Sequence, residues 1–177
     1  MSKGKDLKPH IGIFGRRNNG KSSIINMLVG QDVAIVSDFA GTTTDPVKKS
    51  VEIFGVGPAI IIDTAGIDDS GDLGEKRIER TLKVISTIDL AILVIVSELF
   101  GSYEKDLIKA FQEYQVPFVI FHNKADQKPL SEEARIKIGQ LTNAEILDIS
   151  TLSNDSLVPA TESLLRVLMS SISAFVS

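Results

Sequence analysis

Short apolar runs alternate along this chain with segments in which apolar residues recur every three or four positions. Short apolar runs are typical of buried strands, whereas the three-to-four spacing is typical of helices with one buried face. Their alternation predicts an α/β fold in which helices cover both faces of a mostly parallel sheet. The predicted buried strands are residues 10–14, 59–63, 89–96, 116–121 and 144–149.

Residues 47–54 follow a different pattern and are predicted to form an edge strand. Near its end, Val51 and Ile53 face one way and Glu52 faces the other. In the last predicted helix, Pro159 falls in the first turn, where proline is tolerated. The predicted helices are residues 21–29, about 75–86, 103–114, 132–141 and 156–174. The stripe of the last helix that we expect against the sheet consists of Leu157, Leu164, Leu165, Leu168 and Ile172.

The composition is that of a single globular domain, which we expect to span residues 1–177. Hydrophobic residues make up 43% and charged residues 24%, so disordered, collagen-like and coiled-coil classes are disfavoured. The net charge of −4 argues against a surface built to bind nucleic acid or membrane. No cysteine is present, which excludes disulfides and cysteine-ligated clusters within these residues. No apolar run is long enough to cross a membrane, and we expect a cytoplasmic protein.

The segment GRRNNGKS follows the first predicted strand directly and opens a predicted helix. In this context, the pattern G-x-x-x-x-G-K-[ST] is typical of a phosphate-binding loop, because backbone N–H groups and the helix N-terminus converge on phosphate oxygens. Lys21 is predicted to reach the terminal phosphates, and the Ser22 hydroxyl to ligate Mg²⁺. The remaining residues of the predicted loop contacts are Gly15, Arg17, Asn18, Asn19, Gly20 and Ser23. Asn19 is expected to contribute its backbone N–H rather than its side chain.

The segment DTAG places Asp63 at the C-terminal end of a predicted strand, followed by a tight turn at Gly66. Ligands of open α/β sheets bind at this edge. A carboxylate here can hold Mg²⁺ through water, while the Gly66 N–H meets the terminal phosphate.

The segment NKAD, again directly after a predicted strand, indicates which base is bound. The Asp126 carboxylate can accept hydrogen bonds from N1–H and the exocyclic amine of guanine, a pair of donors that adenine lacks. Asn123 can brace the pocket, and the stem of Lys124 can cover the base. Ser150 and the Thr151 N–H, which follow the last strand, can close over the base oxygen. The predicted nucleotide is therefore GTP, or GDP after turnover.

These motifs, together with AGTTTDP at residues 40–46, resemble the signature segments of small GTP-binding proteins of the translation-factor-related class, which include TrmE and Era. The resemblance implies a Ras-like P-loop GTPase domain: a six-stranded, mostly parallel sheet with one antiparallel edge strand. It also places Thr43 at the position that ligates Mg²⁺ when GTP is bound. The chain departs from the TrmE and Era pattern at Thr44, where arginine is usual, and at Pro46.

Residues 34–53 and 60–81 also resemble the GTPase domain of the HydF family, which takes part in [FeFe]-hydrogenase maturation. This resemblance covers essentially the whole chain. It implies a nucleotide-dependent switch whose partners are the hydrogenase and the radical-SAM maturases. Full-length family members continue into a dimerisation domain and a domain with an iron–sulfur cluster. We therefore expect this chain to be the GTPase domain alone, without a cluster, and to dimerise only through the missing domain. Its apolar end at Phe175 and Val176 fits a removed domain or a frayed helix.

The group that activates the attacking water is not evident from the sequence. Ras-like proteins use a glutamine where this chain has Ile67, which can neither donate nor accept a hydrogen bond. TrmE-like relatives hold K⁺ with a loop asparagine, and the resemblance places Asn18 at that position. The resemblance thus implies slow GTP hydrolysis that K⁺ stimulates. The alternative is that Asn18 only hydrogen-bonds within the loop.

A weaker hypothesis is that an acidic residue of the second switch, residues 64–76, orients the attacking water. Glu75 is the leading candidate. The other candidates are Asp68, Asp69 and Asp72. The alternative is that these residues form a solvated loop. Arg16 and Arg17 could supply charge to the transition state, but we expect both to point outward, toward solvent or another domain.

Three functions fit these observations. The first is an enzyme that hydrolyses GTP. The second is an interaction module in which nucleotide binding orders residues 32–46 and 64–76, so that turnover merely resets it. The third is a GTPase of tRNA modification or ribosome assembly, as in TrmE and Era. The acidic balance and the residues at Thr44 and Pro46 argue against the third.

Overall fold

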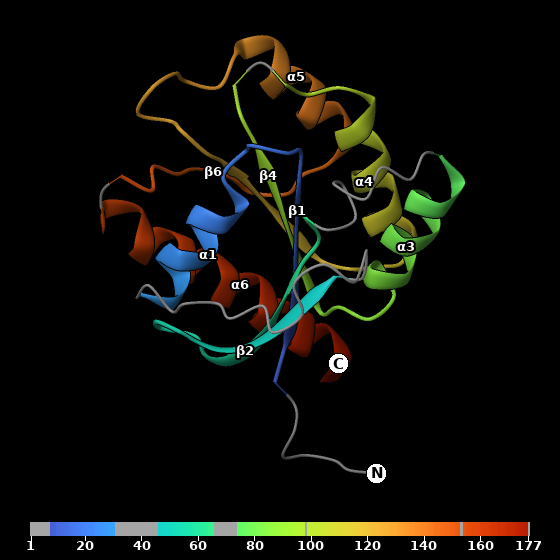
Figure 1. The fold of residues 1–177 in the computed structure, drawn as a ribbon, viewed down its shortest axis with the longest axis vertical. Helices are drawn as coiled ribbons and strands as arrows, with labels where there is room; N and C mark the ends of the chain where they lie inside the picture. Colours follow the sequence, from blue (N-terminus) through green and yellow to red (C-terminus); the bar gives the residue numbers. More distant parts are fainter. Residues whose placement is uncertain (1–7, 31–45, 66–73, 98, 153, 177) are drawn as a thin grey trace.

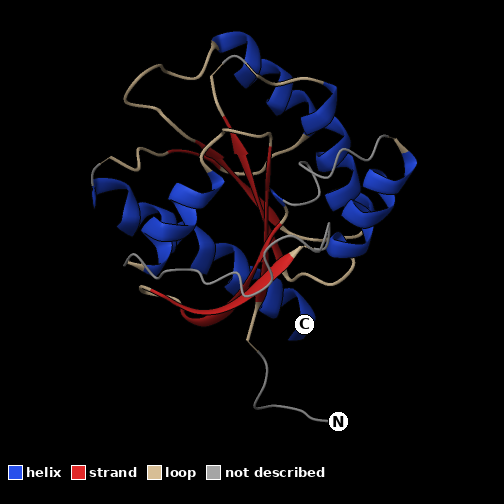
Figure 2. Ribbon diagram, in the orientation of Figure 1, coloured by secondary structure: helices blue, strands red, loops and turns tan. Residues whose placement is uncertain are grey.

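The centre of the fold is a twisted sheet (Figure 1 and Figure 2). Its strand order is β2-β3-β1-β4-β5-β6. The computed structural model describes residues 8–30, 46–65, 74–97, 99–152 and 154–176. Within these residues the sheet has six strands, and every neighbouring pair is parallel except β2 and β3. The strands are β1 His10–Gly15, β2 Val47–Ile53, β3 Gly57–Asp63, β4 Leu90–Ile95, β5 Phe118–His122 and β6 Ile146–Asp148. The predicted fold class and the antiparallel edge strand are confirmed.

Helices cover both faces of the sheet (Figure 1). Helices α1 and α6 pack on one face, and α3, α4 and α5 pack on the other. The helices are α1 Lys21–Val29, α3 Glu75–Ile85, α4 Ser102–Glu113, α5 Glu132–Leu141 and α6 Leu157–Val176, and a 3₁₀ turn, Asn154–Ser156, precedes α6. Among the described residues, no helix combines the length and the apolar character that crossing a membrane requires.

The side chains of β1 alternate between the two cores. Ile11 and Ile13 pack with the α1 and α6 side chains, whereas Phe14 packs with α3 and α4. Phe14 meets Phe111 of α4 edge to face at 5.1 Å between ring centroids. Because a strand exposes successive residues to opposite faces, a strand such as β1, which is apolar after His10, fits the middle of a sheet covered on both sides. This packing fixes the loop that follows β1 at the sheet edge.

The buried face of α6 differs from the predicted stripe. Leu164 is fully buried and Leu168 partly so, but Leu157 and Leu165 are only half-buried and belong to neither core. The side chain of Ile172 lies outside the described residues. The buried face instead runs through Ala160, Thr161, Ser163 and Leu164. The prediction counted leucines, yet small side chains are what lets a helix approach a sheet closely.

Candidate nucleotide-binding site

The motifs that the sequence singled out meet at one edge of the sheet. In the parallel register, Ile13 of β1 is opposite Asp63 of β3, and Gly15 is opposite Val94 of β4. Ile95 at the end of β4 is in turn opposite His122 of β5. The loops after β1, β3 and β5 therefore leave the sheet side by side at the carboxyl ends of the strands. This is the edge at which open α/β sheets bind ligands.

The loop between β1 and α1 turns through left-handed backbone at Asn18 (φ 69°) and Gly20 (φ 92°). Gly20 is required by space as well as by conformation, because a Cβ built there would lie 2.2 Å from Asn123 Nδ2. Helix α1 begins directly after Gly20 and has no side-chain cap at its N-terminus. The first N–H groups of a helix have no acceptor within the helix, so this N-terminus can bind an anion.

Lys21 is held inside this loop. Its side chain is buried, and Nζ donates to the carbonyl oxygens of Gly15 and Arg16. The loop surrounds a cavity of about 250 Å³ lined by Arg16, Arg17, Asn18, Gly20, Lys21, Ser22 and Ala65. A buried ammonium beside an uncapped helix N-terminus makes this cavity suited to phosphate groups. Ser22 and Ser23 lie exposed in the first turn of α1.

In this structure both Asn19 donors make contacts within the protein, and the predicted contact of its N–H with phosphate stays a prediction. Its side chain is buried, and Nδ2 donates to Val94 O at 3.2 Å. Its backbone N–H donates to Arg16 O at 3.2 Å. Both donors thus hold the loop together, because a buried amide must find partners within the protein.

Arg16 points neither to solvent nor to another domain, which corrects the sequence expectation. Its guanidinium forms two hydrogen bonds with Glu104 of α4, at 2.7 and 2.8 Å, and lies 5.5 Å from the ring centroid of Tyr103. Glu104 is fully buried. Its hydrogen bond raises the pKa of Arg16 above the ordinary value, while burial acts in the opposite direction. Arg17, by contrast, is exposed and lines the cavity.

Asn18 is exposed, and its carbonyl oxygen accepts a hydrogen bond from Lys124 Nζ at 3.1 Å. This contact joins the loop after β1 to the loop after β5 through the backbone of Asn18, so it does not test the alternative that the Asn18 side chain only hydrogen-bonds within its own loop. The proposed contact of its side chain with K⁺ stays a prediction.

Asp63 ends β3 beside the phosphate loop. Its Oδ1 accepts the Ala65 N–H at 3.0 Å, and the neighbouring Thr64 hydroxyl donates to Ile13 O at 2.7 Å. Burial lowers the pKa of Lys49, on β2, below its ordinary value, and the charge of Asp63 opposes this shift. The carboxylate is thus fixed at the strand end, where the predicted Mg²⁺ water ligand would lie. Thr43 and Gly66, which complete the predicted set, are outside the described residues.

The loop after β5 is tied to the phosphate loop through Asn123. Its Nδ2 donates to Asn19 O at 2.9 Å, and its Oδ1 is buried with no hydrogen-bond partner among the described residues. Asn123 thus joins the two loops and keeps one buried acceptor, and its predicted role in bracing the base pocket stays a prediction. Lys124 and Asp126 are exposed beyond it, where a base can approach.

The segment after β6 lies against the same loop, since Ala125 N–H donates to Ile149 O at 3.1 Å. The Ser150 N–H donates to Ser156 Oγ at 2.9 Å, so in this structure it is held by the protein. Thr151 is half-buried. Their predicted closure over the base stays untested.

His122 is a residue whose role sequence reasoning missed. It is fully buried, and its Nδ1 lies 2.9 Å from Asp148 Oδ1. This contact joins the ends of β5 and β6 immediately before Asn123. The signal for it would have been a carboxylate at the matching register position of the neighbouring strand, where His122 is opposite Asp148.

Glu75 is the first residue of α3 and is exposed. An acidic residue in a first turn is favoured by the helix dipole alone. Asp68, Asp69, Asp72 and Ile67 lie outside the described residues. The proposal that one of these acids orients water is therefore still open.

Comparison with known proteins agrees with this geometry. Residues 10–124 match the family model described as 50S ribosome-binding GTPase. The tRNA modification GTPase MnmE of Streptococcus gordonii is 39% identical over 159 residues, covering 88% of this chain and 33% of that protein. GTPase Der of Campylobacter hominis is 33% identical over 163 residues, covering 92% and 35%. The chain thus spans about a third of the length of the curated relatives that it matches.

Among solved structures, Era of Aquifex aeolicus bound to GDP·AlF₄⁻ superposes with a TM-score of 0.66. It is 26% identical, and the match covers 90% of this chain and 56% of that chain. The nucleotide and the transition-state mimic in that structure belong to Era.

Proposed function

Because this chain belongs to the 50S ribosome-binding GTPase family, of the TrmE and Era type, we propose that it binds GTP and Mg²⁺ and hydrolyses GTP to GDP and phosphate. The observation that carries the proposal is the loop after β1, in which buried Lys21 and the uncapped start of α1 face one cavity. The exposed carboxylate of Asp126, beyond the Asn123 bridge, supports guanine as the base.

Each group has a defined task in this proposal. The backbone N–H groups at the start of α1 bind phosphate oxygens, and Lys21 places a positive charge between them. Ser22 and Asp63, with Thr43 from the first switch, would hold Mg²⁺, which supplies charge neutralisation for the phosphates when it is bound. No group of three or more His, Asp or Glu side chains in the described residues could hold a metal ion. This fits an ion that depends on nucleotide oxygens for much of its coordination.

Multiple-turnover hydrolysis of GTP with and without Mg²⁺ tests the reaction. We expect release of phosphate that requires Mg²⁺ and is abolished in Lys21→Ala. A matched control is Lys109→Ala, an exposed lysine of α4 outside the cavity, which should leave turnover unchanged. Tight GDP binding without measurable turnover would favour the interaction module instead.

The proposal extends to K⁺ as an activating ion held by Asn18. Support comes from the exposed position of Asn18 at the cavity and from Ile67, which cannot position water. An amide oxygen beside phosphate oxygens is a suitable ligand set for a hard cation. Turnover should be faster in KCl than in NaCl at equal ionic strength, and Asn18→Ala should remove the difference. Equal rates in both salts would contradict this role.

The second-switch proposal has its own test. If Glu75 orients the attacking water, Glu75→Gln should lower turnover while leaving GDP affinity unchanged. Glu79→Gln, an exposed glutamate one turn later on α3, serves as the control. Unchanged turnover in Glu75→Gln would dispose of the hypothesis.

The cellular role is proposed on different grounds. The switch sequence, with Thr44 and Pro46, supports a nucleotide-dependent switch in [FeFe]-hydrogenase maturation. The curated relatives support the alternative more directly, since MnmE is a tRNA modification GTPase at 39% identity. The chain covers only a third of that protein, however, so its substrate does not transfer with the domain.

A binding experiment separates the two roles. Purified domain loaded with GDP or with a non-hydrolysable GTP analogue is presented to the radical-SAM maturases, to the hydrogenase and to bulk tRNA. The maturation role predicts binding of a maturase or the hydrogenase that depends on the nucleotide. Binding of tRNA alone would establish the alternative and would contradict the expectation, drawn from the net charge, that no nucleic acid is bound.

A further inference from the structure

The pairing of Arg16 with Glu104 places a partly buried salt bridge in the wall of the phosphate loop. The two hydrogen bonds, at 2.7 and 2.8 Å, use both oxygens of a carboxylate that is fully buried. Oε1 also accepts the Gly101 N–H at 2.7 Å, which fixes the carboxylate at the first turn of α4. The Arg16 guanidinium therefore binds a carboxylate whose position is already fixed by other contacts.

The backbone of Arg16 is as constrained as its side chain. Its carbonyl oxygen accepts the Asn19 N–H at 3.2 Å and faces Lys21 Nζ at 3.5 Å. The Arg16 side chain thus holds in place a peptide group whose oxygen accepts hydrogen bonds from the Asn19 N–H and from the Lys21 ammonium.

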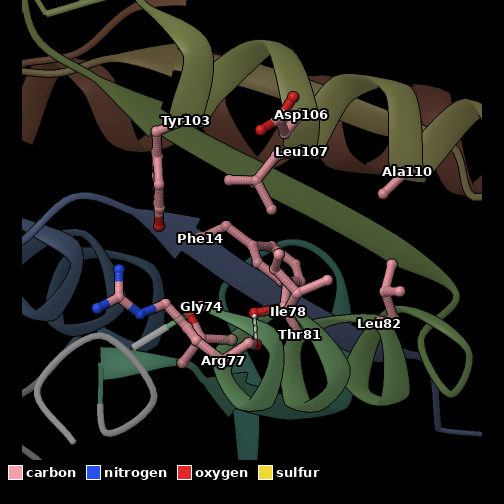
Figure 3. A pocket seen from close by; sticks show the side chains of 11 residues that line it. Phe14, Gly74, Arg77, Ile78, Thr81, Leu82, Tyr103, Asp106, Leu107 and Ala110 are labelled. Carbon is pink, nitrogen blue, oxygen red and sulfur yellow. Dashed lines mark hydrogen bonds between the residues drawn. The ribbon is translucent and has the colours of Figure 1, made fainter. Parts of the chain in front are cut away.

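Tyr103 makes a second contact with the guanidinium. Its ring lies 5.5 Å from the Arg16 guanidinium carbon, a distance at which cation and ring attract. Figure 3 shows the same ring projecting from α4 at one end of a cavity of about 250 Å³ between α3 and α4. Arg16 is therefore held by two successive residues of α4, which is itself packed into the core through Leu107 and Phe111.

We propose that Arg16 and Glu104 are positioning residues for nucleotide binding: the pair docks the phosphate loop on α4 and fixes the Arg16 carbonyl that orients Lys21. This inference rests on the proposed function for its nucleotide and goes beyond it in assigning a role to two residues whose side chains bind each other. Preorganisation of this kind acts on affinity, because a loose loop must be ordered at the moment of binding.

The variant Glu104→Gln distinguishes the positioning role from simple electrostatics, because the two predict opposite changes in GDP affinity. It keeps the shape of the side chain and removes a negative charge near an anionic ligand. Coulomb attraction alone would then tighten nucleotide binding. Loss of the charged fork instead weakens GDP binding by about five- to tenfold, less than the full value of a charge-assisted hydrogen bond because the pair acts on the nucleotide only through the loop. Arg16→Lys keeps the positive charge but not the fork, and it should also weaken binding.

A second Arg–Glu pair, in which one guanidinium nitrogen donates to both carboxylate oxygens, provides the control. Arg166 of α6 donates to Glu145 at 2.8 and 3.0 Å, and both side chains are more exposed than Glu104. Arg166→Ala should leave GDP affinity unchanged. The thermal midpoint of every variant is measured beside its affinity, so that a merely structural loss is recognised by a lower midpoint at unchanged affinity.

The deciding experiment combines GDP titration with steady-state kinetics and amide hydrogen exchange. In Glu104→Gln and Arg16→Lys we expect KM to rise with the loss of affinity while kcat stays within about twofold, as for uniform binding. The Asn19 amide should exchange faster in the nucleotide-free variants. GDP affinity equal to or tighter than that of the parent chain in Glu104→Gln overturns the inference. If the parent chain binds no guanine nucleotide, the proposed function fails instead, and unchanged exchange at Asn19 then overturns this inference separately.

Discussion

The two halves of the candidate site follow strands of the same sheet but differ in how far they are formed before nucleotide binds. The phosphate half is the loop after β1. In it, the side chains of Lys21, Asn19 and Arg16 all donate hydrogen bonds to acceptors of the protein. The base half presents Lys124 and Asp126 on the surface. One residue, Asn123, is buried between them and donates to the phosphate loop.

The difference follows from what each half has to recognise. Phosphates are charged and must be met by N–H groups at fixed positions, since an unordered loop would be ordered at the expense of affinity. A base edge can be read by one exposed carboxylate provided that its strand is rigid. Mutations in the phosphate half should therefore affect stability and binding together, whereas mutations in the base half should affect binding alone.

The strongest way to break this contrast is Gly20→Ala, at the junction of the halves. The new Cβ would lie 2.2 Å from Asn123 Nδ2 on backbone with φ 92°. Because neither the bridge nor the left-handed turn can be kept, we expect a loss of about 2–4 kcal/mol in unfolding free energy. GDP binding should fall by more than about a hundredfold, since the N–H groups at the start of α1 move with the loop.

Gly139→Ala in α5 is the matched control, because its Cβ would meet no neighbour within 4 Å and its φ is not left-handed. An alanine there should stabilise the helix by up to about 1 kcal/mol and leave GDP affinity unchanged. Denaturant unfolding and GDP titration measure both effects. Near-parent affinity in Gly20→Ala would show that the bridge to Asn123 is not needed.

The junction also shows what the sequence could and could not predict. Apolar runs placed five strands and the alternation of residues 47–54 placed the edge strand. The order of the motifs placed Lys21, Asp63 and Asn123 at one edge, because strand ends in a parallel sheet share a side. The partner of Arg16 was not predictable in this way. Arg16 and Glu104 are 88 positions apart, and a glutamate in a first turn is explained equally well by the helix dipole.

The predicted buried face of α6 was wrong for a related reason. Its spacing of leucines suggested a stripe, but burial depends on which side chains allow close approach as well as on which are apolar. Ala160 and Ser163 are fully buried, whereas Leu165 is not. Long-range fit is a property of two elements together, and a pattern within one element does not contain it.

A smaller effect, confined to the base half, is expected for Asp126→Asn. The carboxylate is exposed and free of core packing, so the unfolding free energy should not change measurably. Affinity for GDP should fall by about ten- to a hundredfold, because charge-assisted hydrogen bonds to the base contribute about 1.5–3 kcal/mol. Affinity for ADP should not improve, since adenine lacks the paired donors.

Asp155→Asn, an exposed aspartate of the turn before α6, controls for the loss of one negative charge. Titration with GDP and ADP, together with thermal unfolding, gives the comparison. If Asp126→Asn lowered stability as much as affinity, the base half would be as tightly built as the phosphate half, and the contrast between them would fail.

The smallest effect belongs to a region outside both halves. A hydrogen bond from Ser163 and the charge and hydrogen bond of Arg166 hold the pKa of Glu145 below its usual 4.5, against the opposing effect of burial. Because the folded-state pKa is lower than the unfolded one, the ionised carboxylate stabilises the fold above pH 4.5, and this contribution disappears as pH falls through the folded-state pKa.

Glu145→Gln should therefore cost less than about 1 kcal/mol at pH 7, as for other partly exposed ion pairs. The difference from the parent chain should shrink toward zero on acidification, and GDP affinity at pH 7 should not change. Urea unfolding of both chains across this pH range measures the trend, and a difference that stayed constant with pH would show that Glu145 acts through packing rather than through its charge.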